Sequence, residues 1–372
     1  MRLLVWNIEK FSFNRISPLN RHNYVNGVIS PVAAARPDII AIIEVVARGR
    51  PLGSLLINTG MNGTWLQVFR LNLLTAPATP WRVVPPLSLT GGTRAEAISV
   101  FYNSTTVNLI GPNVWAGPAL GSVPIGAAPA APYGGIWGGP TVAGANTFAG
   151  RCQFNDVNNN PISFPTALHR RPWFVRFQEV APPARTFNLF FVHTSPFPVA
   201  NCVAGVQALW NIPEITAPPV AGQVDVVAGD FNIDAIGGAN FLAAYGPLMG
   251  QGYVPLIPSA AASPSTMLQR RKSAQPPLAA TVWPNRPRYK RVLSLDNILV
   301  RDGGAVVPAP QVIDRVDGTP TPPFVTAMAT PIPAINFLYP PPNVARYTVF
   351  RAANNFRHIR ETSDHLPVVV NL

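Results

Sequence analysis

An acid and an imidazole stand side by side close to the carboxyl end of the chain. Asp364 and His365 follow Ser363 and, after a Leu-Pro step, precede the apolar run 368–370. Two titratable groups at the mouth of a buried strand lose hydration, so they are costly unless they take part in chemistry or find partners. This pair is therefore the first candidate for a catalytic centre.

Further polar side chains end short apolar runs elsewhere in the chain, a pattern typical of sites built where strands end. They are Asn7 in Val-Trp-Asn-Ile-Glu, Glu44 in Ile-Ile-Glu, His193 in Phe-Val-His-Thr-Ser-Pro, Asp230 and Asn232 in Ala-Gly-Asp-Phe-Asn, and Asp296 in Ser-Leu-Asp-Asn-Ile-Leu. Together they offer carboxylate, amide and imidazole groups to one site.

Apolar runs separated by turns predict the elements that would position these residues. The expected strands cover 1–6, 38–43, 81–89, 97–102, 106–110, 173–180, 186–193, 224–229, a stretch within 292–300, 347–350 and 366–372. The expected helices cover 20–35, 64–74, 203–210 and 240–245. Proline- and glycine-rich insertions are expected near 111–150, 258–287 and 303–342. Strand-rich halves with helices between them fit one α+β sandwich domain over residues 1–372.

The composition permits a large core without a membrane span. Of the 372 residues, 48% are hydrophobic, which is enough to fill a sandwich of this size. No run of about eighteen apolar residues occurs, so no transmembrane segment is expected. The 43 prolines and 28 glycines favour many short strands joined by long, turn-rich loops.

The charge balance is strongly basic, with 28 Lys and Arg against 16 Asp and Glu and a net charge of +12. Such a protein is expected to meet a polyanion, either nucleic acid or an anionic membrane surface. The plainer alternative is a basic bias of the genome. Lysine occurs only at positions 10, 272 and 290. Arginine therefore dominates, and its planar fork suits phosphate oxygens.

Two cysteines, Cys152 and Cys202, are too few for a metal knuckle or a disulfide framework. One disulfide and two buried thiols both agree with this count. No signal peptide is recognisable, since the first residues lead directly into a strand. A cytosolic location, a removed leader and another route of export all agree with that. A monomer is the default expectation.

In their order along the chain, these motifs resemble the endonuclease/exonuclease/phosphatase superfamily, whose type member is pancreatic deoxyribonuclease. The resemblance runs from Asn7 to His365 and so covers nearly the whole chain. It implies a four-layer sandwich in which two mixed sheets pack face to face between outer helices. It also implies metal-dependent cleavage of phosphate esters.

The resemblance assigns roles to the strand-end residues. Glu44, Asn7 and Asp364 are the expected metal ligands, and Mg²⁺ is the expected ion, with Mn²⁺ or Ca²⁺ as substitute or auxiliary. His365 is the expected general base, with Asp296 holding its tautomer and stabilising the imidazolium. Asp230 and Asn232 match the pair that orients water and binds the scissile phosphate.

A second pair indicates the deoxyribonuclease branch. His193 in its His-Thr-Ser-Pro context matches that branch, and Glu96 matches its partner. Arg170 resembles the branch's phosphate-binding arginine, although the neighbouring Arg171 fits the sequence pattern equally well. Two valines follow Glu44, close to where the type enzyme has a groove-contacting arginine. Substitutes for that arginine are available at positions 48 and 50.

The leading interpretation is a Mg²⁺-dependent endonuclease that hydrolyses DNA, with RNA as a further substrate class. One alternative is a phospholipid phosphodiesterase or phosphoinositide phosphatase of the same superfamily, for which Trp115 and Trp137 would be the membrane-contacting residues. The other alternative is a family member without catalysis that binds nucleic acid or a protein. It would require the loss of a site group, yet every role has an occupant here.

Overall fold

The computed structural model describes most of the chain but leaves out several insertions. The described residues are 1–17, 21, 25, 36–56, 59–75, 78, 80–93, 95–115, 147–165, 170–195, 198–235, 240–260, 266–270, 282–283, 286–302, 311–312, 363–365 and 367–372. Most of the helix predicted over 20–35, the strand predicted at 347–350 and Trp137 fall outside them.

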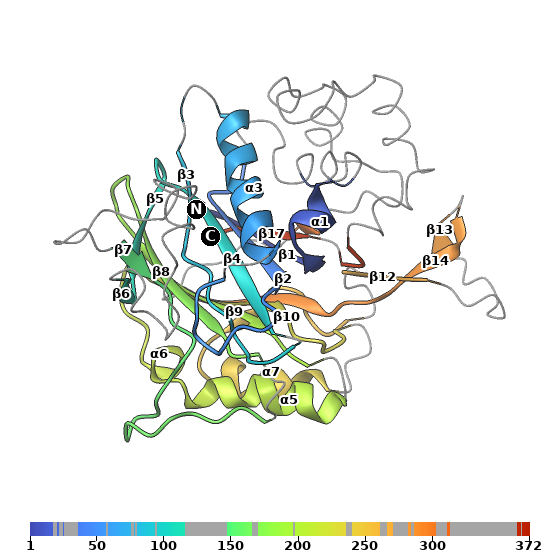
Figure 1. Ribbon diagram of the computed structural model, residues 1–372. Coiled ribbons are helices and arrows are strands. Elements are labelled where there is room, and N and C mark those ends of the chain that lie inside the picture. The colour runs from blue at the N-terminus through green and yellow to red at the C-terminus, as the bar shows by residue number, and fades with distance from the viewer. Residues whose placement is uncertain are drawn as a thin grey trace.

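Two six-stranded mixed sheets form the centre of the molecule (Figure 1). Sheet 1 has, in spatial order, β16 (Gln311–Val312), β17 (Val368–Asn371), β1 (Arg2–Phe11), β2 (Ile39–Val46), β4 (Glu96–Asn103) and β3 (Trp81–Val83). Sheet 2 has β11 (Val254–Pro255), β15 (Asp296–Asp302), β10 (Gln223–Asp230), β9 (Thr186–His193), β8 (Trp173–Glu179) and β5 (Val107–Gly111). Strands β1 and β2 are parallel, as are β9 and β10.

Helices cover the outer faces of both sheets, so the molecule has the four layers expected of the sandwich (Figure 1). On sheet 1 lie α1 (Phe13–Ile16) and α3 (Thr59–Leu74). On sheet 2 lie α5 (Val199–Ala208), a 3₁₀ turn (Leu209–Asn211), α6 (Pro213–Thr216) and α7 (Phe241–Met249). The predicted α+β fold is therefore confirmed. None of the described helices is long and apolar enough to cross a bilayer.

One continuous core joins the two sheets, because the central strands are apolar on both faces. Strand β2 begins with the run Ile-Ile-Ala-Ile-Ile, every residue of which is fully buried. Across the sheet interface the rings of Tyr102 and Phe177 meet edge to face, with their centroids 5.1 Å apart. Large aromatic contacts of this kind hold the sheets in one relative position.

The two cysteines are both buried free thiols, which decides between the alternatives left by the sequence. Burial raises the pKa of Cys152 to about 12, so this thiol stays protonated at neutral pH.

Several predicted boundaries were wrong. Helix α5 begins at Val199 rather than at 203, α7 extends to Met249 rather than 245, and the strand predicted over 81–89 ends at Val83. Strand β1 runs past Asn7, and β2 runs past Glu44, so neither residue ends its strand. Instead the register shifts next to both residues, at irregularities within the strands.

The insertions contain strands, although their proline and glycine content predicted loops. The first has β6 (Asn113–Trp115) paired with β7 (Thr147–Ala149). The second contains a three-stranded sheet of β12 (Met267–Arg270), β14 (Arg286–Leu293) and β13 (Val282–Trp283). The strand predicted within 292–300 is β15, which begins at Asp296, while residues 292 and 293 belong to β14.

Candidate active site

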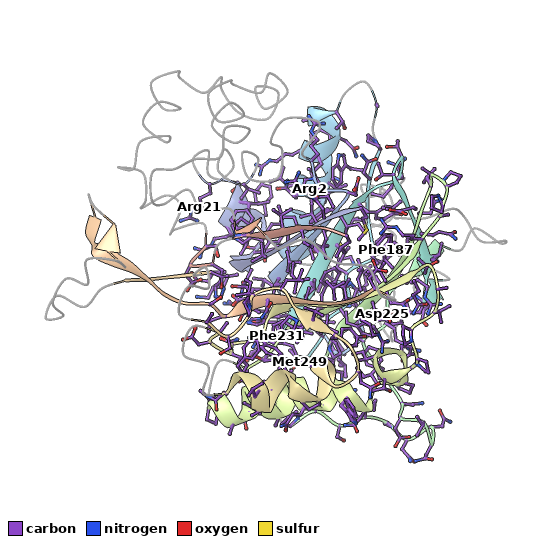
Figure 2. All side chains as sticks on the ribbon, turned by 180° about the vertical axis from the view of Figure 1, so that it is seen from behind. Arg2, Arg21, Phe187, Asp225, Phe231 and Met249 are labelled. Carbon is purple, nitrogen blue, oxygen red and sulfur yellow. The ribbon has the colours of Figure 1, made fainter. Side chains whose placement is uncertain are left out.

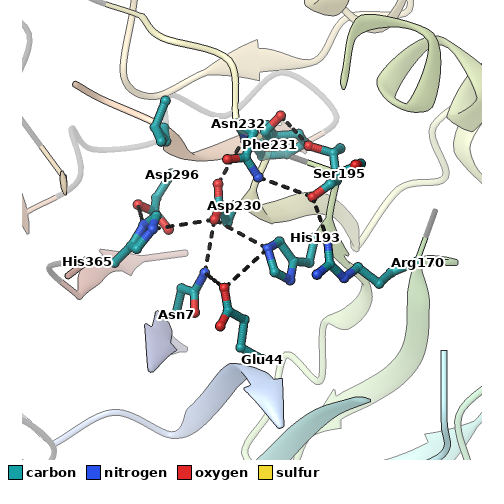
Figure 3. Close-up of polar contacts among 12 residues, drawn as sticks. Asn7, Glu44, Arg170, His193, Ser195, Asp230, Phe231, Asn232, Asp296 and His365 are labelled. Atoms are coloured by element: carbon teal, nitrogen blue, oxygen red, sulfur yellow. Dashed lines mark hydrogen bonds and ion pairs between the residues drawn. The ribbon is translucent and has the colours of Figure 1, made fainter. Parts of the chain in front are cut away.

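The candidate residues converge where the two sheets meet, and each sheet supplies half of them (Figure 3). Sheet 1 and its flanks bring Asn7, Glu44, Glu96, Asp364 and His365. Sheet 2 and its flanks bring Arg170, His193, Asp230, Asn232 and Asp296. Strand register explains the second group, because Asp230 lies opposite His193 on one side and opposite Asp296 on the other. Three side chains separated by many residues in sequence are therefore direct neighbours.

His365 and Asp296 form a buried pair across the sheet interface. His365 Nδ1 lies 2.8 Å from Asp296 Oδ2, and its Nε2 faces Asp230 Oδ2 at 3.6 Å. Asp296 therefore holds the tautomer that leaves Nε2 pointing at the site. Burial acts to lower the pKa of His365, but the charges of Asp296, Asp230 and Asp364 outweigh it and raise this pKa well above its usual value.

Backbone and hydroxyl contacts hold this pair in position. Ser363 Oγ donates to the Asn7 carbonyl at 2.5 Å and accepts the His365 N–H at 2.9 Å. The indole N–H of Trp6 donates to the His365 carbonyl at 2.9 Å. On the other side, Thr266 Oγ1 accepts the backbone N–H of Asp296 at 3.0 Å. Both ends of the pair are thus fixed by neighbours that are themselves buried.

His193, Glu96 and Arg170 form a second chain of contacts. His193 Nδ1 lies 2.9 Å from Glu96 Oε2, and Arg170 Nη2 lies 2.6 Å from Glu96 Oε1. Burial acts to raise the pKa of Glu96, but His193 and Arg170 outweigh it and hold this pKa at about 2. Glu96 is therefore a carboxylate at any physiological pH. The Nε2 of His193 remains directed at the site, 3.5 Å from Asp230 Oδ2 and 3.5 Å from Glu44 Oε1.

The structure separates the roles of neighbouring arginines. Arg170 turns toward Glu96, whereas Arg171 donates to the Ile162 carbonyl at 3.5 Å and lies over the ring of Phe164. Near Glu44, Arg48 lines the cleft beside the site, whereas Arg50 Nε donates to the Leu55 carbonyl at 3.1 Å.

Asp230 lies at the centre of the site, between the two histidines (Figure 3). Its Oδ2 accepts a hydrogen bond from Asn7 Nδ2 at 2.9 Å, and its Oδ1 accepts the Asn232 N–H at 2.9 Å. The preceding Gly229 has φ +148°, and a Cβ atom there would lie 2.0 Å from the Val192 carbonyl oxygen. Glycine is therefore required for β10 to approach β9 closely enough to place Asp230 beside His193.

The Thr194 carbonyl, just beyond β9, accepts hydrogen bonds from two candidate phosphate-binding side chains. Arg170 Nη1 donates to it at 3.0 Å and Asn232 Nδ2 at 3.1 Å. The Thr194 N–H in turn donates to the Asp230 carbonyl at 3.0 Å. Sequence reasoning did not identify Thr194, Thr266 or Ser363 as supports, because a single hydroxyl or carbonyl carries no motif of its own.

Asn7 and Glu44 are the residues that best fit a divalent cation. Asn7 Nδ2 donates to Glu44 Oε1 at 3.2 Å, while Asn7 Oδ1 is buried and accepts no hydrogen bond from the described residues. An amide oxygen without a partner beside a carboxylate is a hard-oxygen donor set of the kind that Mg²⁺ prefers. Asp364, the third expected ligand, is partly buried and close enough to His365 for its charge to raise the pKa of that ring.

A second cluster of side chains could also surround a cation. Asp230, Asp296 and His365 each place a ligand atom within 4.8 Å of the others. However, His365 Nδ1 already contacts Asp296, so binding a cation between them would break the pair. The oxygens of Asn7 and Glu44 need no such rearrangement, so they fit a cation better.

Left-handed backbone conformations concentrate around the site. Four described residues other than glycine have positive φ, and three of them are Lys10 (54°), Glu44 (64°) and Asn232 (51°). Backbone strain of this kind is maintained only where the surrounding structure requires it. Here the turn at Lys10 directs its N–H to Glu44 Oε2 at 3.2 Å. The irregularities in β1 and β2 therefore bring Glu44 to the site from within a strand.

A cleft of about 810 Å³ opens beside these residues. Its lining includes Glu44, Glu96 and Arg170 from the site, together with Lys10 near the end of β1 and Arg48 in the turn after β2. A substrate in this cleft would lie next to the cation residues and beside three positive side chains.

No family model and no curated protein sequence matches this chain. Solved structures do match it over its whole length. An endonuclease/exonuclease/phosphatase family protein from Leptotrichia buccalis is 14% identical, with a TM-score of 0.48 and coverage of 100% of this chain and 98% of that one. TDP2 from D. rerio, in complex with a single-strand DNA product, is 12% identical, with a TM-score of 0.46 and 100% and 97% coverage.

A mannosyl-6-phosphatase from Bacteroides thetaiotaomicron is 12% identical, with a TM-score of 0.43 and coverage of 100% of this chain and 98% of that one. The family named from the motifs is thus the one named for the first of these matches.

Proposed function

We propose that this protein is a Mg²⁺-dependent phosphodiesterase that cleaves DNA internally. The observation that carries the proposal is the convergence of two histidine–carboxylate pairs on Asp230, beside the oxygens of Asn7 and Glu44. Hydrolysis of a phosphodiester needs a proton acceptor, donors for the developing charge and a cation. This site has an occupant for each of these roles.

The attacking water is oriented and deprotonated on one side of the site. Asp230 and Asn232 accept and donate hydrogen bonds there, and His365 Nε2 takes the proton. Asp296, whose Oδ2 lies 2.8 Å from His365 Nδ1, stabilises the resulting imidazolium. Glu44, Asn7 and Asp364 would hold Mg²⁺, which when bound neutralises negative charge on the phosphate oxygens.

Groups on the other side of the site assist the leaving oxygen. His193 has its Nδ1 against Glu96 and its Nε2 directed into the site, so it can donate a hydrogen bond or a proton to the departing oxygen. Arg170 and Asn232, held by one carbonyl, would grip the phosphate between the two histidines. With one histidine for the attacking water and another for the leaving oxygen, the site suits a phosphate ester whose leaving group is an alcohol.

The partner that suits this site is a nucleic acid, and we assign DNA. The net charge of +12 and the positive side chains of the cleft favour a long polyanion. We further propose that residues 1–372 act as one domain, because both sheets contribute to the same site. A monomer suffices, since each role is filled from within one chain.

Nicking of supercoiled plasmid by the purified protein tests this function. We expect Mg²⁺-dependent nicking that chelator abolishes, that His365→Ala abolishes, and that His193→Ala reduces. Arg82→Gln is the control, because Arg82 lies on β3 opposite Tyr102, at the end of sheet 1 away from the site. If the wild type cuts neither DNA nor RNA but releases phosphate or headgroups from phospholipids or inositol phosphates, the nuclease assignment fails.

A further inference from the structure

The three-stranded sheet of β12, β14 and β13, here named the basic arm and limited to these three strands, extends away from the two main sheets (Figures 1 and 2). Its middle strand β14 pairs antiparallel with β12 on one side and with β13 on the other. It belongs to neither six-stranded sheet, and none of the candidate catalytic or metal-binding residues lies in it.

The arm begins and ends at the candidate active site. Thr266, the residue before β12, accepts the backbone N–H groups of Leu295 and Asp296 through its Oγ1, at 3.0 Å each. Directly after β14, the Ser294 N–H donates to Asp234 Oδ1 at 2.9 Å. Asp296 is the partner of His365, so the root of the arm lies against the proposed catalytic pair.

The arm carries a high concentration of positive charge and no negative charge. The three strands contain no Asp or Glu, while five of the 28 basic residues of the chain fall in them: Arg270, Arg286, Arg288, Lys290 and Arg291. Since these residues are close in sequence, their charges repel one another, and a polyanion would relieve the repulsion.

Strand geometry places part of this charge in a row. Successive residues of a strand alternate between its faces, so positions 286, 288 and 290 of β14 belong to one face. All three are basic. In the register, Lys290 is opposite Gln269 on β12 and opposite Val282 on β13. Residues two apart on a strand are about 6.6–6.8 Å apart, close to the spacing of phosphates along one nucleic-acid strand.

We propose that the basic arm binds the nucleic-acid backbone on the side of the scissile phosphate adjoining Asp296. A two-stranded or three-stranded ribbon fits a duplex groove, and Arg and Lys neutralise phosphates along it. We favour a nucleic acid over a membrane because the basic positions 286, 288 and 290 repeat along one face at close to the spacing of phosphates on a nucleic-acid strand. The inference rests on the proposed nuclease function and adds an extended contact to it.

Two double variants test the arm. Arg286→Gln/Arg288→Gln removes two charges from one face of β14. Arg36→Gln/Arg82→Gln removes two charges near the ends of β2 and β3 that lie away from the site. Binding to a duplex is measured over a salt series in the His365→Ala background, in which no cutting is expected. Turnover is measured separately with plasmid and with bis(p-nitrophenyl) phosphate, a diester too small to reach the arm.

In the arm variant, we expect the slope of log K against log salt concentration to become shallower by about 1.8, roughly 0.9 for each lost phosphate contact. Plasmid cleavage should fall by about tenfold at moderate salt, while turnover of the small diester stays unchanged. The control variant should keep the wild-type values. An unchanged salt slope would overturn the proposal, as would an equal loss on both substrates.

Binding to vesicles of anionic phospholipid, measured with the same variants, tests whether the arm binds a membrane instead of a nucleic acid. If the arm variant loses vesicle binding and keeps the duplex salt slope, the arm is a membrane contact and the proposal is wrong. Since duplex binding is measured without cleavage, failure of the nuclease assignment and failure of the arm proposal give different results.

Discussion

His193 and Asp230 are register partners at the carboxyl ends of two parallel strands, and their side chains meet with His193 Nε2 3.5 Å from Asp230 Oδ2. Adjacent parallel strands end at the same edge of a sheet, so no loop has to bring these residues together. Half of the candidate site therefore follows from the order of strands in sheet 2.

The pair of His365 and Asp296 should act as one unit. We expect Asp296→Asn and His365→Ala each to lower kcat/KM for plasmid cleavage by about 10² to 10⁴, because proton transfer at this position is lost in both. The double variant should be no worse than His365→Ala alone, since partners in one network are not additive. Additive losses would show that the two residues act independently.

The second pair should matter less than the first. Glu96→Gln removes the charge that faces His193 and Arg170, and we expect a smaller fall in kcat than for Asp296→Asn. His193→Ala should lose more on a substrate with a poor leaving group than on one with a good leaving group, because an aid to departure is needed most for the former. Equal losses on both substrates would assign His193 to phosphate binding alone.

Removing the Glu44 carboxylate should weaken the cation site. In Glu44→Gln we expect the Mg²⁺ concentration for half-maximal activity to rise by about tenfold or more, with partial recovery at high Mg²⁺. Calorimetric titration of Mg²⁺ into the free protein gives the same comparison without catalysis. The matched control is Glu179→Gln, whose carboxylate pairs with Arg185 at the end of β8 away from the site. An unchanged Mg²⁺ dependence in Glu44→Gln would place the cation elsewhere.

Glu96 should link the stability of the fold to pH. Its pKa is about 2 in the folded protein against an ordinary value of 4.5, so the folded state favours the carboxylate. The stabilisation is complete above the unfolded value and is lost as pH falls through the folded one. Between these limits the slope approaches about 1.4 kcal/mol per pH unit. Urea midpoints from pH 5 to pH 2 should fall less steeply for Glu96→Gln than for the wild type.

A side chain at Gly229 should disturb the fold itself. Gly229→Ala places a Cβ against the Val192 backbone, so we expect a loss of about 2–4 kcal/mol in the free energy of unfolding. Gly91→Ala is the control, because a Cβ there meets nothing within 4 Å. Similar urea midpoints for the two variants would mean that β9 and β10 separate easily at this point.

The fold and the members of the site were largely predictable from the sequence. Strand β9 matches its predicted range, and β10 differs by one residue at each end, because both are apolar runs that end on a polar residue. The motifs also named the residues that the structure brings together. Their catalytic and metal-binding roles stay predictions, which the variants above address.

The local backbone around the site was less predictable. The left-handed turns at Lys10 and Glu44 depend on how β1 and β2 pair, which is long-range information. Likewise, β14 has the composition of a loop, with a proline and four basic residues, yet it is paired on both sides. In each case, hydrogen bonds to residues distant in sequence determined the backbone conformation, against the preference of the local sequence.

Each pair in the site takes one partner from each sheet: Asn7 with Asp230, Glu96 with His193, and His365 with Asp296. A slide of one sheet past the other by a single residue, about 3.3 Å, would separate all three pairs while every strand kept its hydrogen bonds. The packing between the sheets, including the Tyr102 and Phe177 rings, thus sets the alignment that catalysis requires. A loosened but still fully β-structured molecule would be inactive.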